Sequence, residues 1–166
     1  MCIRDRATVH RQENTDNPIR LMAIIEGLNA VARDIAVILP LHPRTRKILK
    51  EDTLSLLASN IKIIPPIGYF DMLGFQRNAL LIATDSGGVQ KEAYFSGRPC
   101  VTLRDETEWV ELVSSGWNRL VKPVSKEDVF DGIMAAIGTK GEEVSLYGTG
   151  SSAYEIVDYM HRRLVK

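Results

Sequence analysis

Short apolar runs rich in β-branched residues alternate along the chain with longer segments in which apolar residues recur every three or four positions. The short runs have the length and composition of buried strands. Six strands are predicted, at residues 7–10, 35–41, 61–66, 80–85, 99–104 and 118–123. Because strands and helices alternate at these intervals, the pattern indicates an α/β fold with a doubly wound, parallel, six-stranded Rossmann-like sheet.

The helical segments carry start signals as well as periodicity. In the first, Asp16 or Asn17 can cap the helix, and Pro18 suits the first helical position. Ser125 and Asp128, three residues apart, resemble the capping box of a later helix. Two more helices are predicted over residues 86–96 and 151–164.

The order of the strands predicts where a ligand binds. In the common order 3-2-1-4-5-6, the first and fourth strands are neighbours, and ligands bind beyond their carboxyl ends, where the chain reverses direction. The first strand is followed by "HRQENTD" and the fourth by "DSGGVQKE". These are the two most polar strand exits in the chain, so we expect them to face each other across a binding site.

Two glycines stand where the fourth strand passes into a helix. Free N–H groups and the positive end of the helix dipole favour an anion there, and Gly87 and Gly88 have no Cβ to keep a phosphate away. Ser86 can add a hydroxyl, and Glu92 can accept hydrogen bonds from a ribose diol. The alternative is that the glycines only make a tight turn and that Glu92 is solvated. Neither G-x-G-x-x-G nor a Walker motif is present, which disfavours a dehydrogenase.

Other polar residues also follow strands. His10 ends the first strand and is followed by Arg11 and Glu13, and His42 ends the second strand in the same way. Arg104 leaves the fifth strand, either in a polar loop or as another arm of a nucleotide pocket. A zinc site would need three or four convergent ligands at a recognisable spacing, and we predict no metal site.

Composition narrows the class of protein. The 166 residues suffice for one domain, and 21 basic and 21 acidic residues balance, so no nucleic-acid or membrane partner is indicated. Two cysteines make no disulfide framework, and no apolar stretch of about 20 residues occurs. We therefore expect a cytoplasmic location. Residues 1–6 are charged and irregular, and we expect them to be foreign or disordered; a frayed natural terminus is the alternative.

Five motifs together resemble the non-hydrolysing UDP-N-acetylglucosamine 2-epimerases. They occur in order from about residue 7 to about residue 160: "TVHRQEN", "LHPRT", "GYFDML", "TDSGGVQKEAYFSGRPCVTLRDETEWVE" and "YGTGSSAYEIV". The resemblance is to the carboxyl-terminal half of the family, which has two Rossmann-like domains facing across a cleft in the glycosyltransferase-B arrangement. It implies that residues 7–166 form a single UDP-binding domain with a C-terminal helix and that the amino-terminal domain is missing.

The resemblance implies a reaction and a set of roles. Family members interconvert UDP-N-acetylglucosamine and its manno epimer by eliminating UDP and adding it back, with no cofactor and no metal. Ser86, Gly87 and Gly88 would hold the phosphates, Glu92 the ribose, and His10 a phosphate or the leaving group. The resemblance also implies a homodimer that acts in polysaccharide biosynthesis.

The remaining residues are assigned by the same resemblance. Arg104 would lie near the uridine, Arg11 and Glu13 near the cleft, and His42 matches a histidine linked to a regulatory substrate site. Trp109 departs from the family pattern, because some members have an arginine there.

The acid/base carboxylates belong to the absent domain. We therefore expect this chain alone to fold, to bind UDP weakly and not to epimerise. The alternatives are an epimerase of a related UDP-2,3-diacetamido sugar, half of a nucleotide-sugar glycosyltransferase, and a nucleotide-binding module without chemistry.

Overall fold

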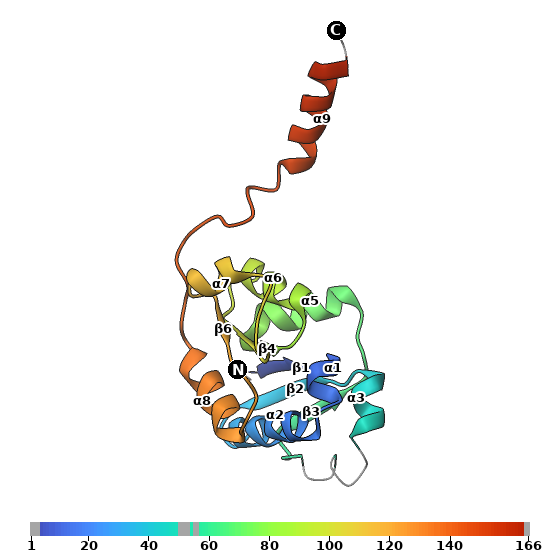
Figure 1. The fold of residues 1–166 in the computed structure, drawn as a ribbon, viewed down its shortest axis with the longest axis vertical. Helices are drawn as coiled ribbons and strands as arrows, with labels where there is room; N and C mark the ends of the chain where they lie inside the picture. The colour runs from blue at the N-terminus through green and yellow to red at the C-terminus, as the bar shows by residue number, and fades with distance from the viewer. Residues whose placement is uncertain (1–3, 50–53, 55–56, 165–166) are drawn as a thin grey trace.

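The computed structural model describes residues 4–49, 54 and 57–164, and its centre is a parallel sheet (Figure 1). All neighbouring strands pair in parallel, in the order β3-β2-β1-β4-β5-β6, as predicted. The strands within these residues are β1 (Arg4–Thr8), β2 (Ala36–Pro40), β3 (Ile61–Ile64), β4 (Ala79–Thr84), β5 (Cys100–Thr102) and β6 (Asn118–Leu120).

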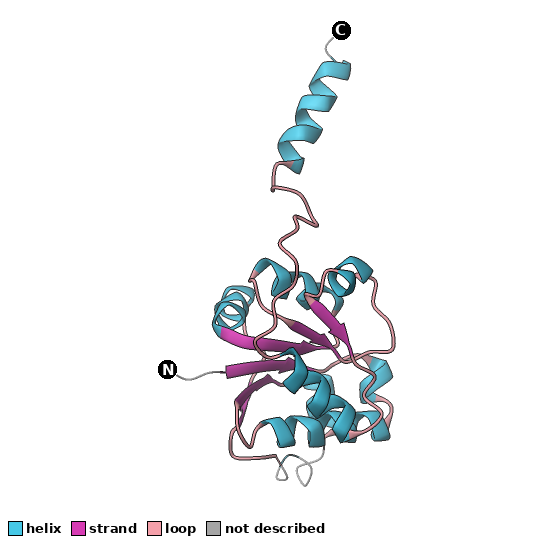
Figure 2. Ribbon diagram, turned by 90° about the vertical axis from the view of Figure 1, so that its left-hand side faces the viewer, coloured by secondary structure: helices cyan, strands magenta, loops and turns pink. Residues whose placement is uncertain are grey.

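Helices cover both faces of this sheet, which makes the fold doubly wound (Figures 1 and 2). Helices α2 and α8 pack together on one face, and α5, α6 and α7 lie on the other. The helices of the described residues are α1 (Gln12–Thr15), α2 (Pro18–Val31), α3 (Pro43–Ile48), α5 (Tyr69–Asn78), α6 (Gly87–Phe95), α7 (Val110–Ser114), α8 (Lys126–Ala136) and α9 (Ser152–Leu164).

The two principal covering helices begin where their sequence signals predict. Asn17 caps α2, because its side chain accepts hydrogen bonds from the N–H groups of Ile19 and Arg20, and Pro18 is the first helical residue. Ser125 and Asp128 form the predicted capping box of α8. These local bonds set the starts of α2 and α8, and burial of their apolar sides holds them on the sheet.

Close packing between α2 and α8 depends on one glycine. A Cβ added to Gly27 would lie 2.6 Å from the Cβ of Val129, which is closer than such carbons approach in folded proteins. Val129 is completely buried in the main core, together with Ile24, Leu28 and Ile133. The absence of a side chain at residue 27 therefore lets the two helices approach each other over the sheet.

Strand β1 begins earlier than the sequence suggested. Arg4 and Arg6 already pair with β2 and β4. The expectation that residues 1–6 are disordered is therefore wrong for residues 4–6, and the alternative that they are foreign stays a prediction. Residues 1–3 lie outside the described residues. The prediction was wrong because residues 4–6 are all charged and lack the apolar pattern by which a buried strand is recognised. Their backbone nevertheless pairs with a strand on each side.

Helix α9 extends away from the sheet and its covering helices (Figure 1). The predicted helix over 151–164 is confirmed, but none of its residues is buried. Its apolar side is exposed, with Tyr154, Ile156, Val157, Tyr159, Met160 and Leu164 all at least half exposed.

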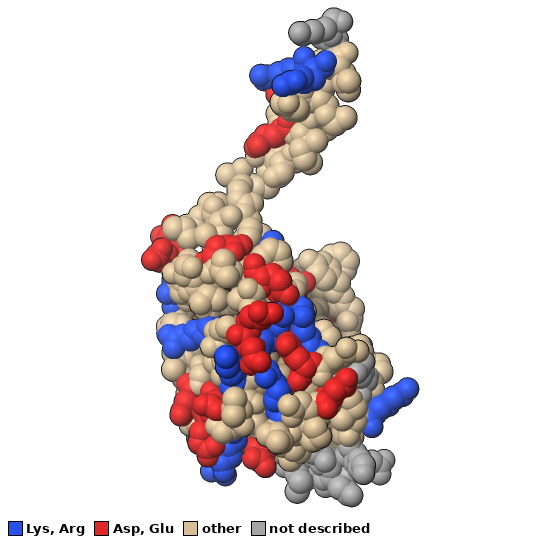
Figure 3. Space-filling view, viewed as in Figure 1, with Lys and Arg blue, Asp and Glu red and all other residues tan. Residues whose placement is uncertain are grey.

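Acidic and basic side chains are interspersed over the face shown in Figure 3, in keeping with the balanced formal charge. This face therefore presents no large single-sign patch. Among the described residues, no helix combines the length and apolar character that crossing a bilayer requires.

Candidate functional site

The exits of β1 and β4 meet, as the strand order predicts, and a buried carboxylate joins them. Thr8 pairs with Thr84 at the ends of the two strands, and the chain continues into Asp85, whose side chain is fully buried. Asp85 accepts hydrogen bonds from the backbone N–H groups of His10 and Arg11, both at 2.9 Å, and from the side-chain amide of Asn14 at 3.1 Å. The carboxylate therefore shapes the loop that carries the predicted residues His10, Arg11 and Glu13.

Sequence reasoning placed Asp85 at the end of a strand and gave it no role. A signal was present, because an acid that ends a buried apolar run and precedes "SGG" needs partners when it is buried. The sequence could not show that those partners come from a loop more than seventy residues earlier.

His10 forms an ion pair with the same carboxylate. Its Nδ1 lies 3.2 Å from Oδ1 of Asp85. The hydrogen bond to Asp85 raises the pKa of His10 above its ordinary value, against the opposing effect of partial burial. Burial alone would raise the pKa of Asp85, but hydrogen bonds from His10 and Arg11 outweigh it and lower that pKa. The pair thus favours a cationic imidazole beside an ionised carboxylate.

The two predicted glycines lie in the first turn of α6. Ser86 is the N-cap residue, but its side chain makes no capping hydrogen bond. Neither Gly87 nor Gly88 has a positive φ. A Cβ at Gly88 would meet nothing within 4 Å, and the nearest atom to a Cβ at Gly87 would be 3.5 Å away. The turn therefore does not require glycine. The space beside Gly88 is open, whereas side chains of Glu108, Arg11 and Trp109 border Gly87.

A cleft of about 260 Å³ lies against this helix terminus. Its polar lining residues include His10, His42 and Ser86. Its apolar lining residues include Pro66, Ile67 and Val89. The rings of His10 and His42 lie 5.7 Å apart, so the exits of β1 and β2 share this cleft. The lining of the cleft thus combines groups that can bind a charged ligand with apolar side chains.

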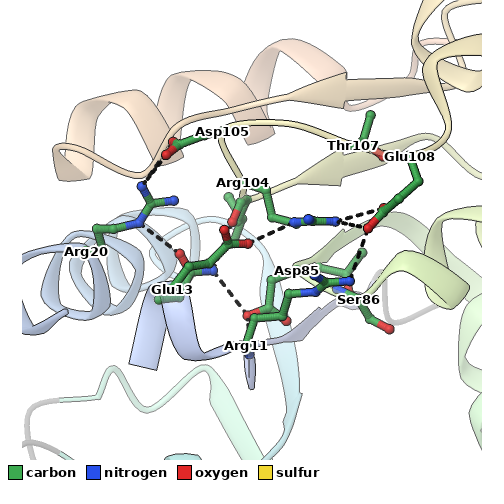
Figure 4. A network of polar contacts seen from close by, with 12 residues as sticks. Arg11, Glu13, Arg20, Asp85, Ser86, Arg104, Asp105, Thr107 and Glu108 are labelled. Atoms are coloured by element: carbon green, nitrogen blue, oxygen red, sulfur yellow. Dashed lines mark hydrogen bonds and ion pairs between the residues drawn. The ribbon is translucent and has the colours of Figure 1, made fainter. Parts of the chain in front are cut away.

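Arg104 is held between two carboxylates (Figure 4). Its Nε donates to Glu13 at 2.8 Å, its Nη1 donates to Glu108 at 2.9 Å, and its side chain is only 6% exposed. Arg11 reaches the same Glu108 at 3.4 Å. The structure therefore brings Arg11, Glu13 and Arg104 together, as predicted, and joins them through Glu108, which sequence reasoning left in a polar loop.

One acidic member of this cluster, Glu108, is stabilised as an anion. The backbone N–H of Glu108 and the guanidinium of Arg104 lower the pKa of the Glu108 carboxyl. At the edge of the cluster, Arg20 of α2 pairs with Asp105 at 3.0 Å (Figure 4). The loop after β5 is thereby tied to α1 and α2.

Glu92 stands apart from the cleft wall. It lies one and a half turns along α6 and accepts a hydrogen bond of 2.5 Å from the side-chain amide of Gln76. Glu92 is not among the described residues that line the cleft, whereas His42 is.

Trp109 has a position that its residue type did not suggest. Its indole N–H donates to the carbonyl oxygen of Gly87 at 2.9 Å, and Lys91 lies 3.5 Å from the centre of its ring. An indole in a polar loop needs a partner for its N–H when it is half-buried. Trp109 is therefore bonded directly to the first residue of the glycine turn.

The described part of the chain holds no group of three or more metal-ligating side chains that could bind an ion. The site is therefore built from backbone N–H groups, histidine and paired charges.

The family model described as UDP-N-acetylglucosamine 2-epimerase matches residues 6–161. The chain belongs to this family. A curated relative from Pseudomonas aeruginosa, UDP-2,3-diacetamido-2,3-dideoxy-D-glucuronate 2-epimerase, is 45% identical over 156 residues, covering 93% of this chain and 43% of the relative. The UDP-N-acetylglucosamine 2-epimerase of Methanocaldococcus jannaschii is 45% identical over 155 residues, covering 90% of this chain and 42% of the relative.

A solved structure agrees with this assignment. The Methanocaldococcus jannaschii epimerase in complex with UDP-GlcNAc and UDP matches with a TM-score of 0.86 and 40% identity, over 97% of this chain and 46% of that one. The chain therefore spans a little less than half the length of these epimerase-family relatives. Its fold is one Rossmann-like half of a glycosyltransferase-B-type protein, and the family predicted from the ordered motifs is confirmed.

Proposed function

We propose that this chain is the UDP-binding half of a UDP-N-acetylglucosamine 2-epimerase and corresponds to the carboxyl-terminal half of the family. The observation that carries the proposal is the open first turn of α6 at the β1/β4 switch point. Gly87 and Gly88 stand there although the backbone does not require glycine, and the residue before them, Ser86, lines the same cleft as His10. A backbone left bare beside free N–H groups suits the close approach of a phosphate.

The proposed reaction removes and restores UDP. A base takes the proton from C2 of the sugar, and the electron pair of the C2–H bond forms the C1–C2 double bond. The C1–oxygen bond breaks at the same time, and UDP leaves with the electron pair of that C1–oxygen bond. UDP then adds to C1 as a proton returns to C2 on the other face. The C2 proton is weakly acidic, so the departing diphosphate must be stabilised as its charge develops.

This chain would supply that stabilisation. Ser86, Gly87 and Gly88 would hold the diphosphate at the helix terminus. The cationic form of His10, favoured by Asp85, would face the developing charge. Glu92 would accept hydrogen bonds from the ribose hydroxyls.

The charged cluster has a supporting place in the proposal. Arg104 would border the uridine side of the pocket. Its bond to Glu13 would hold Glu13 near the cleft, and Glu108, its other partner, would hold Arg11 there. His42 would belong to a neighbouring regulatory site, since its ring lies 5.7 Å from that of His10. The acid and base at C2 would come from outside this chain, so we expect the chain alone not to epimerise.

The sugar has a second candidate. The Pseudomonas relative, whose name specifies a diacetamido glucuronate, is as similar to this chain as the named UDP-N-acetylglucosamine epimerase. A related UDP-2,3-diacetamido sugar is therefore the alternative substrate. We further propose that the whole protein is a homodimer of polysaccharide biosynthesis, as the family resemblance implied, and that it is cytoplasmic, as the composition indicated.

Calorimetric titration of UDP into the purified chain tests the proposal. We expect saturable binding that Gly88→Val weakens at least about tenfold, because the new side chain would occupy the phosphate position. Gly74→Val is the matched control, since a Cβ at Gly74, a helical glycine of α5, also meets nothing within 4 Å. Thermal melts establish that both variants are folded.

Three results would contradict the proposal. A folded chain that does not bind UDP would refute the nucleotide grip. Equal loss of affinity in both valine variants would show that helix stability, and not the open space beside Gly88, governs binding. Epimerisation by the chain alone would overturn the assignment of the acid and base to another part of the protein.

A further inference from the structure

A buried glutamine on α5 makes a single side-chain contact that has no evident benefit for stability. Gln76 is fully buried, and its Nε2 lies 2.5 Å from Oε2 of Glu92. A carboxylate can only accept hydrogen bonds, so the amide nitrogen must face it, and the orientation of the Gln76 amide follows from the chemistry. Its carbonyl oxygen is buried and has no hydrogen-bond partner among the described residues.

A second buried glutamine shows what a structural role requires. The carbonyl oxygen of Gln90, on α6, accepts hydrogen bonds from Thr107 at 2.6 Å and from Asn118 at 2.9 Å. Gln90 is therefore satisfied and links α6 to β6 and to the loop after β5. An unsatisfied buried carbonyl opposes folding, so an apolar side chain would suit position 76 better if stability alone decided.

The hydrogen bond from Gln76 leaves most of the Glu92 carboxylate available. A carboxylate has about four acceptor positions, and the bond from Gln76 uses one of them on Oε2. Glu92 is half-buried on α6, and its side chain would otherwise rotate among several conformers. Fixing it before a ligand arrives removes an ordering cost from binding.

We infer that Gln76 is a positioning residue that holds the carboxylate of Glu92 for the ribose hydroxyls of the nucleotide. The inference rests on the proposed function, in which Glu92 receives the ribose. Gln76 sets selectivity for a ribose over a deoxyribose and touches no ligand itself. The carbonyl of Gln76, buried and unpaired among the described residues, makes this residue less stabilising than an apolar one at position 76, but its amide orients the Glu92 carboxylate.

The test is calorimetric titration of UDP and 2′-deoxy-UDP into the unaltered chain and into Gln76→Met, which has nearly the same length and no donor. We expect the unaltered chain to prefer UDP. We expect Gln76→Met to weaken UDP binding about fivefold to tenfold, to leave 2′-deoxy-UDP binding almost unchanged, and to keep or raise the melting temperature. A merely structural role would lower the melting temperature and weaken both ligands together.

Two further variants complete the test. In Glu92→Ala, adding Gln76→Met should have no additional effect on UDP affinity, because the residue through which Gln76 acts is absent. Asn78→Leu is the control on the same helix, since its amide bonds only to the carbonyl of Gly74 in α5. It should leave both affinities unchanged.

The outcomes separate this inference from the proposed function. No binding of UDP by the unaltered, folded chain would overturn the proposed function and this inference with it. UDP binding without preference over 2′-deoxy-UDP would leave the nucleotide grip in place and refute the ribose contact on which Gln76 acts. Two results would overturn this inference alone. One is that Gln76→Met still prefers UDP over 2′-deoxy-UDP. The other is that Gln76→Met weakens UDP binding as much in the Glu92→Ala background as in the unaltered chain.

Discussion

Two carboxylates lie on opposite sides of Arg11 and do different work (Figure 4). Asp85 is fully buried and accepts hydrogen bonds from the main chain of His10 and Arg11. Glu108 is half exposed, at 50%, and pairs with the guanidinium groups of Arg11 and Arg104. Asp85 therefore fixes the backbone of the loop after β1, whereas Glu108 only orients the side chains of Arg11 and Arg104.

The difference follows from solvent. A buried carboxylate must replace its lost hydration with hydrogen bonds from the protein. Substituting it leaves each of its buried donors without an acceptor. An exposed carboxylate keeps much of its hydration whether or not its partner is present, so its ion pair changes stability little. The comparison predicts that stability depends on burial more than on the number of charges in contact.

Removing the buried carboxylate should have the largest effect. Asp85→Ala leaves two backbone N–H groups and the Asn14 amide without their acceptor, and we expect it to lower the free energy of unfolding by about 3 kcal/mol. Urea denaturation measures this change. Asp158→Ala is the control, because the Asp158–Arg162 pair is exposed on both sides, and it should cost under about 1 kcal/mol. Similar losses in the two variants would break the comparison.

Removing Arg104, a buried arginine whose two carboxylate partners are partly exposed, should have a smaller effect. Arg104→Met keeps the aliphatic stem and frees Glu13 and Glu108, which are exposed enough to be hydrated, so we expect a loss of about 1 kcal/mol. Arg162→Met is the matched control, since the Arg162–Asp158 pair on α9 is exposed on both sides and should contribute almost nothing. A loss at Arg104 as large as that at Asp85 would show that the cluster carries the fold.

The smallest effect concerns pH. The pKa of His10 is raised in the folded chain, so its contribution to stability is complete below the ordinary histidine value of 6.5 and is lost as pH rises through the folded value. We expect the loss to be about 0.5 kcal/mol, because the His10 side chain is 38% exposed. Melts between about pH 6 and pH 9 on the unaltered chain and on His10→Gln measure it.

The titration of His10 can also be followed directly by NMR. In Asp85→Asn the pKa of His10 should fall, since the carboxylate that raises it is gone. A His10 pKa that does not respond to this substitution would remove Asp85 from the account of the histidine. The depressed pKa of Asp85 works in the opposite direction, because its contribution is lost only as pH falls through the folded value.

Much of the fold was predictable because its signals are local. Asn17 and Pro18 mark the start of α2 within two residues, and a capping box marks that of α8. The alternation of strands and helices was enough for a parallel sheet, and the polarity of two strand exits agreed with the strand order. The ordered motifs were also enough to indicate the family, because each is a continuous stretch of the chain.

The candidate site was predictable only in part. Arg11 and Glu13 were expected near the same sheet edge as Arg104, and they lie beside it, but Asp85 and Glu108, which hold them, were not recognised. The role of a carboxylate depends on its burial and on donors far along the chain. Neither property is written in its neighbouring residues.

Local pattern was sufficient for the elements, their order and the family, because capping bonds and apolar periodicity act within a few residues. Packing between distant segments was needed for the rest. It buried the apolar side of α8 and left that of α9 exposed, although both sequences are amphipathic. It also brought Gln76 to Glu92 and Asp85 to the loop after β1, because the sheet places strand exits side by side that are separated by dozens of residues in the chain.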